Sequence, residues 1–149
     1  MFDFTVIKPS TYRESTHDLT EIINFLHTHL GQYGDNKEDI RKCLNYALSD
    51  EPGFGGFVVT ARDTQKGNLA GVVVINDTGM EGYIPENILV YIAVHDGYRG
   101  KGLGKSLMKT TMETAEGDIA LHVEPDNPAR YLYEKLGFTN KYLEMRYTR

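Results

Sequence analysis

A short segment in the second half of the chain combines glycines and basic side chains in a pattern that can bind an anion. Residues 97–105 read Gly-Tyr-Arg-Gly-Lys-Gly-Leu-Gly-Lys, with four glycines and three cations. Glycines let the backbone approach a ligand closely and adopt positive φ angles. The cations Arg99, Lys101 and Lys105 would add charge-assisted hydrogen bonds to an anionic ligand. We therefore predict a phosphate or pyrophosphate site in this segment.

The elements on either side of this segment are those that such a site requires. Residues 88–94 form a continuous apolar run rich in β-branched side chains, which is typical of a strand buried on both faces. Residues 103–116 repeat apolar side chains at helical spacing. A helix that begins directly after a glycine-rich turn presents free N–H groups and the positive end of its dipole to an anion. Strand, turn and helix together support the phosphate site.

Three glycine-rich patterns compete for this segment. A Walker A loop needs G-x-x-x-x-G-K-[ST]; residues 104–106 supply its second half, but Arg99 stands where the first glycine belongs. A dinucleotide fingerprint needs G-x-G-x-x-G, whereas these glycines occupy every second position from 100 to 104. The third pattern, [QR]-x-x-G-x-[GA] after a strand, is matched in full by residues 99–104.

A second motif follows at residues 121–138, where N-x-A-x-x-L-Y-x-x-x-G-F comes after a predicted strand. Helical spacing places four of its side chains on one buried face: Ala129, Leu132, Tyr133 and Leu136. Tyr131 falls on the opposite face, so Tyr133 is the tyrosine that points inward. A buried tyrosine hydroxyl needs a partner. Taken alone, the pattern favours a core tyrosine bonded to a carbonyl over a catalytic one.

The two motifs together resemble the GNAT superfamily of N-acetyltransferases, in which the [QR]-x-x-G-x-[GA] loop binds the pyrophosphate of acetyl-CoA. The resemblance covers residues 88–138, and the first 85 residues match only in the order of their elements. It implies direct transfer of an acetyl group from acetyl-CoA to an amine acceptor, without a metal. The residues that it assigns to cofactor binding are Ile92, Ala93, Val94, Arg99, Gly100, Lys101, Gly102, Leu103, Gly104, Lys105 and Asn127.

The resemblance also implies how these residues act. The backbone of residues 92–94 would pair with the pantetheine arm, and one of its N–H groups would stabilise the oxyanion of the tetrahedral intermediate. Asn127 would contact the pantetheine arm, and its side chain also suits the N-cap of the helix that follows. Tyr133 would be the general acid that protonates the leaving thiolate.

The reaction also needs a general base, because only about one in 10³ primary amine molecules is neutral at pH 7. The main candidates are Glu86, at the start of the apolar strand, and Glu124, after the next strand; Glu81 and His122 are further choices. His122 and Glu124 are expected on one face of a strand at 118–123. A solvated loop charge is the commoner role for each carboxylate, and a chain of water molecules can replace a single base.

The whole pattern predicts an α/β fold with a GNAT-like mixed sheet, in the order β-α-α-β-β-β-α-β-α-β. The expected strands are 2–8, 57–62, 69–76, 88–94, 118–123 and 142–147, and the expected helices are 17–31, 37–49, 103–116 and 127–136. A helical crossover makes 88–94 and 118–123 a central parallel pair, with the ligand at their carboxyl ends. No repeat or long linker divides the chain, so we expect a single domain over residues 1–149.

Composition excludes several classes of protein. The net charge of −5 argues against a general nucleic-acid binder and is compatible with a cationic substrate. The single cysteine, Cys43, lies on the apolar face of a predicted helix and allows neither an internal disulfide nor a cysteine cluster for metal. No leader-like segment opens the chain and no apolar run approaches the length of a membrane span, so we expect a cytoplasmic protein without membrane contact.

Two other functions stay open. A GNAT fold that binds acyl-CoA as a sensor, without turnover, is the second hypothesis, because no base is certain. A P-loop NTPase is the third, and it rests only on residues 104–106. The acceptor is expected to be set by residues 17–49 and 77–87, which contain no diagnostic motif, so a protein α-amine, a lysine, a polyamine and a small amine all stay open. Dimers are common in the family, and a homodimer is compatible with the resemblance.

Overall fold

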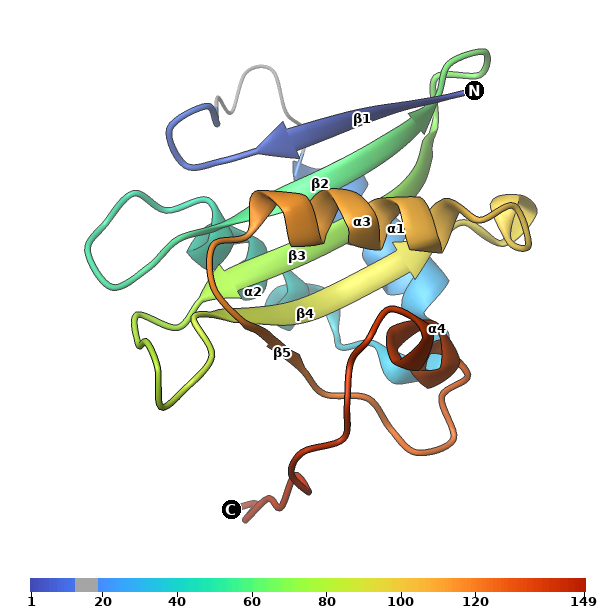
Figure 1. The fold of residues 1–149 in the computed structure, drawn as a ribbon. Helices are drawn as coiled ribbons and strands as arrows, with labels where there is room; N and C mark the ends of the chain where they lie inside the picture. Colours follow the sequence, from blue (N-terminus) through green and yellow to red (C-terminus); the bar gives the residue numbers. More distant parts are fainter. Residues whose placement is uncertain (13–18) are drawn as a thin grey trace.

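The computed structural model describes residues 1–12 and 19–149. Within these residues the centre of the molecule is a five-stranded sheet with the strand order β1-β2-β3-β4-β5 (Figure 1). The strands are β1 (Phe2–Ile7), β2 (Gly56–Asp63), β3 (Leu69–Asp77), β4 (Asn87–Val94) and β5 (Ile119–Leu121). Neighbours from β1 to β4 are antiparallel, and β4 runs parallel to β5. The predicted mixed α/β sheet and its parallel pair are therefore confirmed.

Helices cover both faces of this sheet. On one face lie α1 (Leu19–Leu30) and α2 (Lys37–Ala47), and on the other lie α3 (Leu103–Thr114) and α4 (Ala129–Lys135) (Figure 1). Single 3-10 turns, η1 (Gly31–Tyr33) and η2 (Asp96–Tyr98), follow α1 and β4. Because successive side chains of a strand point to opposite faces, Val72 and Val74 join the core under α1 and α2, whereas Val73 and Ile75 join the core under α3.

Strand β4 is only partly paired on its β5 side. Three of its residues, 87–89, pair with β5, and no strand of the described chain continues the pairing beyond them. On the β3 side, Leu89 lies opposite Ile75 and Tyr91 opposite Val74, so Val90 is the extra residue of a β-bulge. A bulge bends its strand and redirects side chains. The two strands therefore diverge toward their carboxyl ends (Figure 1).

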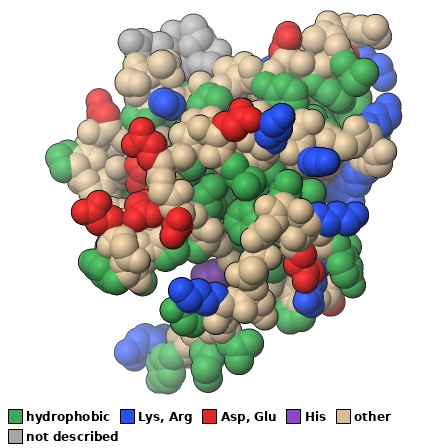
Figure 2. Space-filling model, viewed as in Figure 1, with side chains coloured by type: hydrophobic (Ala, Val, Ile, Leu, Met, Phe, Trp, Pro, Cys, Tyr) green, Lys and Arg blue, Asp and Glu red, His purple; other side chains and the backbone are tan. Residues whose placement is uncertain are grey.

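Charged side chains divide the face of the molecule that carries α3. Figure 2 shows Lys and Arg side chains gathered on the side where α3 begins, and Asp and Glu side chains gathered on the opposite side. In the sequence, the exposed cations Lys101, Lys105 and Lys109 lie just before α3 or within it, and the exposed acids Glu116 and Asp118 follow its end. The helix thus runs from a basic to an acidic end.

Several predicted elements differ from the structure. No strand forms at 142–147: residues 138–149 have no regular structure, and Tyr142, Leu143, Met145 and Tyr147 are at least 80% exposed. A strand needs a neighbour, and this segment pairs with none in the described chain. The strand predicted at 118–123 ends at Leu121, so His122 and Glu124 lie in a loop, and the expectation that they share a strand face was wrong.

The helix boundaries shift by small amounts. The helix predicted at 127–136 begins at Ala129, with Pro128 at its N-cap position, so Asn127 precedes the helix. The start predicted for the first helix, at residue 17, lies outside the described residues. Among the helices of residues 1–12 and 19–149, none has the length and apolar character needed to cross a membrane.

Candidate active site

The glycine-rich segment joins β4 to α3 with a row of unpaired backbone donors. Gly100 and Gly102 have φ angles of 79° and 77°, in the left-handed region that favours glycine. In the described part of the chain, no group accepts a hydrogen bond from the N–H groups of residues 100–105. Free N–H groups at the start of a helix are a binding site for phosphate groups. The segment predicted from its glycines therefore has the geometry of an anion site.

The three cations of this segment have different roles in the structure. Lys101 and Lys105 are exposed and pair with no carboxylate of residues 1–12 and 19–149. Arg99 instead places Nη2 3.1 Å from Asp96 Oδ1, and the same nitrogen donates to the carbonyl of His29 at 3.3 Å. Arg99 Nε donates to the carbonyl of Val94 at 3.4 Å. Lys101 Nζ lies 5.6 Å from the centre of the Tyr98 ring. Arg99 therefore braces the loop against α1 and β4, while neither lysine is held by a carboxylate of the described residues.

Tyr98 anchors the loop on its other side. Its side chain is buried, and its hydroxyl donates to Asp63 at the end of β2 and lies 3.3 Å from Asn68 Oδ1. This bond lowers the pKa of the Asp63 carboxyl and raises the pKa of the Tyr98 hydroxyl. Phe2 packs edge-on against the Tyr98 ring, with 5.4 Å between centroids. Side chains thus fix the loop from two sides and leave its N–H groups free.

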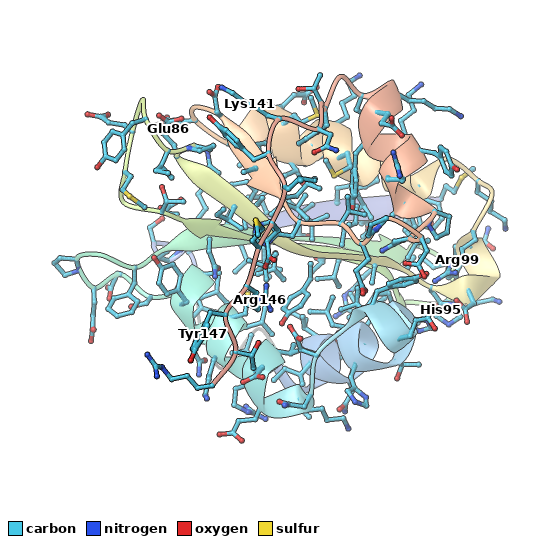
Figure 3. The ribbon with its side chains drawn as sticks, turned by 90° about the horizontal axis from the view of Figure 1, so that it is seen from below. Glu86, His95, Arg99, Lys141, Arg146 and Tyr147 are labelled. Atoms are coloured by element: carbon cyan, nitrogen blue, oxygen red, sulfur yellow. The ribbon has the colours of Figure 1, made fainter. Side chains whose placement is uncertain are left out.

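Two histidines meet where α1 approaches this loop. The rings of His29 and His95 are stacked with 4.4 Å between centroids, and Figure 3 shows His95 beside Arg99. His29 Nδ1 is buried without a hydrogen-bond partner, and Asp96 Oδ1 is 3.9 Å away. Burial, followed by the nearby His95, lowers the pKa of His29. The stack holds the end of α1 against the loop.

Tyr133 points inward from α4, as the helical spacing predicted. It is 7% exposed and belongs to the apolar cluster against which Ile92 and Val94 pack, whereas Tyr131 is 65% exposed. Burial raises the pKa of Tyr133 to about 12. The carbonyl partner expected of a core tyrosine is not found: within the described residues, its hydroxyl makes no hydrogen bond. The side chain of Tyr133 therefore shares a cluster with Ile92 and Val94 of β4, and its hydroxyl keeps its proton at neutral pH.

Gly104 lets α4 come close to the loop. A Cβ atom at this position would lie 3.3 Å from Leu132 Cδ2 and 3.9 Å from Val94 Cγ2. The first turn of α3, the buried face of α4 and the end of β4 therefore meet at this glycine. A larger side chain there would push α4, and Tyr133 with it, away from β4.

Asn127 combines a structural contact with a free donor. Its Oδ1 accepts from the N–H of Ala129, the first residue of α4, at 2.9 Å, although the N-cap position itself is held by Pro128 and not by Asn127 as the sequence suggested. In the part of the chain that the structure describes, its amide NH₂ group has no acceptor. That group is available to a ligand, which is compatible with the predicted contact to a pantetheine arm.

The candidate bases are not equivalent. Figure 3 shows Glu86 at the opposite end of β4 from His95 and Arg99. A strand rises by about 3.3 Å per residue, so Glu86 lies roughly 20 Å from Ile92. Its carboxylate accepts from the N–H groups of Gly82 at 3.0 Å and Asp118 at 2.7 Å. The bond from Asp118, followed by that from Gly82, lowers the pKa of Glu86, which makes it a weak base in a distant position.

Glu124 keeps its place among the candidates. It is exposed in the loop between β5 and α4, and within the described residues its carboxylate takes part in no ion pair. His122, two residues earlier, is also exposed. Neither side chain has a fixed partner that would aim it at an amine. No group of three or more His, Cys, Asp or Glu residues in the described chain is placed to hold a metal ion.

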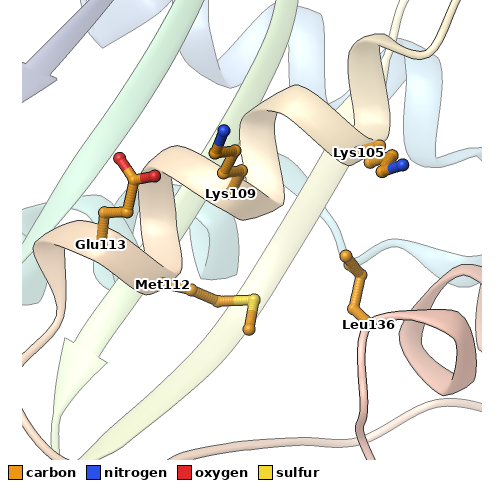
Figure 4. A pocket seen from close by; sticks show the side chains of 5 residues that line it. All are labelled: Lys105, Lys109, Met112, Glu113 and Leu136. Atoms are coloured by element: carbon orange, nitrogen blue, oxygen red, sulfur yellow. The ribbon is translucent and has the colours of Figure 1, made fainter.

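A hollow of about 310 Å³ extends the basic side of the site along α3 (Figure 4). It is lined by Lys105, Lys109, Met112, Glu113 and Leu136. Its lining is mainly apolar, and the two lysines stand at successive turns of the helix that begins at the loop. A ligand whose phosphates occupy the loop therefore has further cations and an apolar surface beside it.

Sequence reasoning missed a polar contact on the other face of β4. Tyr91, within an otherwise aliphatic strand, is 6% exposed and donates its hydroxyl to Asp35 Oδ2 at 2.6 Å. Burial, followed by the bond to Asp35, raises the pKa of Tyr91, so it remains a neutral donor. The partners are 56 residues apart in sequence, and no local pattern connects them. The tyrosine itself was the only signal that could have drawn attention to this position.

The described chain thus combines a mixed sheet, a glycine-rich loop with free N–H groups and a strand edge on β4 that is only partly paired. The model of the acetyltransferase (GNAT) family matches residues 16–138 of this chain. The protein therefore belongs to the GNAT acetyltransferase family, as the two motifs predicted. No curated protein sequence is similar enough to match the chain.

Solved structures share the fold at low sequence identity. A ribosomal-protein-alanine N-acetyltransferase from Brucella melitensis biovar Abortus 2308 is 22% identical, with a TM-score of 0.65 and 100% coverage of both chains. A chain of the NatC complex bound to Gag peptide and CoA is 20% identical, with a TM-score of 0.69, over 94% of this chain and 87% of that one. An aminoglycoside acetyltransferase from an uncultured soil metagenomic sample is 17% identical, with a TM-score of 0.64, over 100% and 99%.

Proposed function

We propose that the protein, as one domain over residues 1–149, transfers the acetyl group of acetyl-CoA directly to a primary amine. The observation that carries this proposal is the row of free N–H groups at residues 100–105 beside the unpaired edge of β4. A pyrophosphate needs several converging donors, and the amides of a pantetheine arm can pair with an open strand edge. Membership of the GNAT family supports CoA as the carrier, and one structurally similar complex was solved with CoA.

Each part of the site has a role in this proposal. The N–H groups of residues 100–105 hold the pyrophosphate, assisted by Lys101 and Lys105, while Arg99 keeps the loop in position. The backbone of Ile92, Ala93 and Val94 pairs with the pantetheine arm, and the amide of Asn127 donates to it. The full set of proposed cofactor-binding residues is Ile92, Ala93, Val94, Arg99, Gly100, Lys101, Gly102, Leu103, Gly104, Lys105 and Asn127.

The reaction then follows from the chemistry of a thioester. The amine nitrogen attacks the thioester carbonyl carbon, a C–N bond forms, and the carbonyl oxygen becomes an oxyanion that a β4 backbone N–H stabilises. The C–S bond breaks, and Tyr133 donates its proton to the departing sulfur. Burial raises the pKa of Tyr133 to about 12, so its hydroxyl is protonated at neutral pH and has a proton to donate.

The attacking amine must also lose a proton. Glu124 is the remaining carboxylate candidate near the carboxyl end of β5, and a water molecule can carry the proton in its place. Glu86 is not assigned this role, because its carboxylate is already bonded to two N–H groups at the far end of β4. The proton balance is complete when Tyr133 regains its proton from solvent or from the base.

Calorimetric titration with acetyl-CoA tests the first step, and binding in the micromolar range is expected. A panel of acceptors then tests turnover: a peptide with a free α-amine, an N-blocked peptide with one lysine, a polyamine and an aminoglycoside, with product detected by mass spectrometry. Acetylation of one class names the acceptor. Binding without turnover across the panel would indicate an acyl-CoA sensor, and absence of binding would contradict the proposal.

A further inference from the structure

The bulge in β4 determines which side of the site an acceptor can use. Val90 is the extra residue, so Val90 and Tyr91 both pack on the face covered by α1 and α2. Beyond the bulge, Ile92 and Val94 pack on the other face, with Tyr133. The proposed cofactor loop and acid thus lie on the α3 side of the open edge. An amine has to approach the same edge from the α1 and α2 side, where Tyr91 lies.

The connection between α1 and α2 contacts both β4 and the loop after β5. Tyr33, at the end of η1, donates its hydroxyl to the carbonyl of Asp126, in the loop between β5 and α4, at 3.3 Å. Two residues later, Asp35 accepts from Tyr91 of β4 at 2.6 Å. Residues 33–35 therefore touch both sides of the gap that β4 and β5 leave between them. Asn36 fixes the far end of this segment, because its side chain caps α2 by accepting from the N–H of Asp39 at 2.8 Å.

Asp35 is a fixed and otherwise unpaired carboxylate at this position. It is exposed, whereas the tyrosine that donates to it is buried. In the described chain no lysine or arginine forms an ion pair with it. A carboxylate that is held by a buried hydroxyl of β4 and has no cationic partner in the described chain is prepared to bind a cation.

The chemistry of acetyl transfer limits which cation this can be. The attacking nitrogen must be neutral, but a nearby carboxylate stabilises the charged ammonium form. If Asp35 bound the reacting amine, it would therefore hold that amine in its unreactive state. The cation that suits Asp35 is a second one, on the same acceptor and a few bonds away from the nitrogen that reacts.

Building on the proposed function, we propose that Asp35, positioned by Tyr91, binds a second cationic group of the acceptor and so selects acceptors with two positive charges. Short diamines and peptides with a basic residue next to the reacting amine share this chemistry.

The test compares two acceptors of equal length, 1,5-diaminopentane and pentylamine, with saturating acetyl-CoA. In the wild type, kcat/KM for the diamine is expected to exceed that for the monoamine about tenfold, and salt reduces this ratio because ions screen the pairing. The Asp35→Asn variant keeps a hydrogen-bond acceptor for Tyr91 and loses the charge. It is expected to bring the ratio close to one, with pentylamine rates and the KM for acetyl-CoA unchanged.

Two further variants separate the effect of the Asp35 charge from the effect of the Tyr91 hydroxyl that donates to it. Asp39→Asn is the matched control. Asp39 is an exposed aspartate of the same region, and its Oδ1 lies 3.7 Å from Lys42 Nζ. The ratio of kcat/KM for the diamine to that for the monoamine should equal the wild-type ratio in this variant. Tyr91→Phe leaves the carboxylate and removes its donor, so an intermediate ratio is expected. Peptides that begin Ala-Lys and Ala-Leu repeat the comparison and distinguish a peptide from a free diamine as the source of the second cation.

The outcomes distinguish this inference from the function on which it rests. A wild type that acetylates both amines equally, or an Asp35→Asn variant that keeps the wild-type ratio, would overturn the role of Asp35 and leave acetyl transfer intact. A wild type that binds acetyl-CoA and acetylates no amine would overturn acetyl transfer itself. Thermal unfolding of each variant shows whether a lost rate reflects a lost fold.

Discussion

Both ends of β4 are flanked by glycines and charged side chains. They differ in whether the backbone groups of the adjoining loops are hydrogen-bonded. At the amino end, the side chains of Glu86 and Asn87 are bonded to backbone groups of neighbouring loops. Glu86 accepts from Gly82 and Asp118, and Asn87 Nδ2 donates to the carbonyls of Glu116 at 2.7 Å and Asp118 at 3.1 Å. These contacts join the loop before β4 to the turn before β5.

At the carboxyl end, side chains brace the loop from outside and leave its own N–H groups free. Tyr98 and Arg99 hold the segment, while residues 100–105 offer their donors to no other part of the described chain. Both ends have glycines in the left-handed region, such as Gly117 at one end and Gly102 at the other. Glycines and charges alone therefore do not mark a binding loop. The distinction is whether the chain satisfies its own backbone groups, because unsatisfied ones need a partner.

The largest expected effect concerns Tyr133, the proposed general acid. Tyr133→Phe removes the proton for the leaving thiolate, so kcat should fall by about 10²–10⁴, with little change in acetyl-CoA affinity. Stopped-flow or steady-state rates and calorimetry measure the two quantities. Because the pKa of Tyr133 is raised to about 12, its hydroxyl keeps its proton up to about pH 10. The wild-type kcat should therefore show no decline caused by this group between about pH 8 and 10.

Tyr131→Phe is the control for this experiment, because its ring is on the exposed face of the same helix. It should keep the wild-type rate. A Tyr133→Phe protein with an undiminished kcat would show that this buried hydroxyl has a packing role only.

A pair of glycine substitutions tests the comparison between the two ends directly. In both Gly102→Ala and Gly117→Ala, an alanine enters a left-handed position, at a cost of about 1–2 kcal/mol. A Cβ at residue 102 meets nothing within 4 Å, but at residue 117 it would overlap the side chain of Glu86. Gly117→Ala should therefore lower stability further in urea unfolding and leave acetyl-CoA affinity unchanged.

Gly102→Ala should show the reverse balance, with weaker acetyl-CoA binding and a smaller loss of stability. Gly102→Asn should recover part of the affinity, because asparagine adopts the left-handed conformation more readily than alanine. Equal losses of affinity at the two positions would contradict the division of β4 into a structural and a binding end.

The smallest expected effect on the reaction is that of Glu86→Gln, whose kcat should stay close to the wild-type value. The folded state holds the pKa of Glu86 below its unfolded value of about 4.3. Its contribution to stability is therefore fully present above about pH 4.3 and is lost as the pH falls through the folded-state pKa. The stability difference between wild type and variant should accordingly shrink from about pH 7 to pH 3 in urea unfolding.

Glu81→Gln serves as the comparison, because Glu81 is exposed in the same loop and its carboxylate accepts no hydrogen bond from the described residues. Glu81→Gln should change neither kcat nor the pH dependence of the stability. If Glu86→Gln reduced kcat as strongly as Tyr133→Phe, the amino end would be part of the catalytic machinery after all.

The sequence was sufficient wherever a feature is local. The apolar run of β4, the glycines that follow it and the helical spacing that turns Tyr133 inward are each contained in a few successive residues, and the structure confirms their placement. The parallel pairing of β4 with β5 also follows from a general rule for strand–helix–strand units. The family and the fold could therefore be predicted.

Features that depend on distant partners could not be predicted. The bulge at Val90 exists only in the register with β3, and the bond between Tyr91 and Asp35 joins segments that meet only in the folded chain. The stack of His29 on His95 is of the same kind. The strand predicted at 142–147 was wrong because its local pattern suits a strand but the described residues contain no partner for it. Its alternating residues are suitable for a strand, and the described chain offers no neighbouring strand for it to pair with.

The open edge of β4 has a consequence for the protein in storage and in the cell. A strand with unpaired backbone groups can be extended by any other extended chain, including another molecule of the same protein. The pantetheine arm of the proposed cofactor would occupy that edge and close it to such pairing. Preparations depleted of acetyl-CoA are therefore expected to be the more prone to aggregate, and the cofactor would act as a solubility factor as well as a reactant.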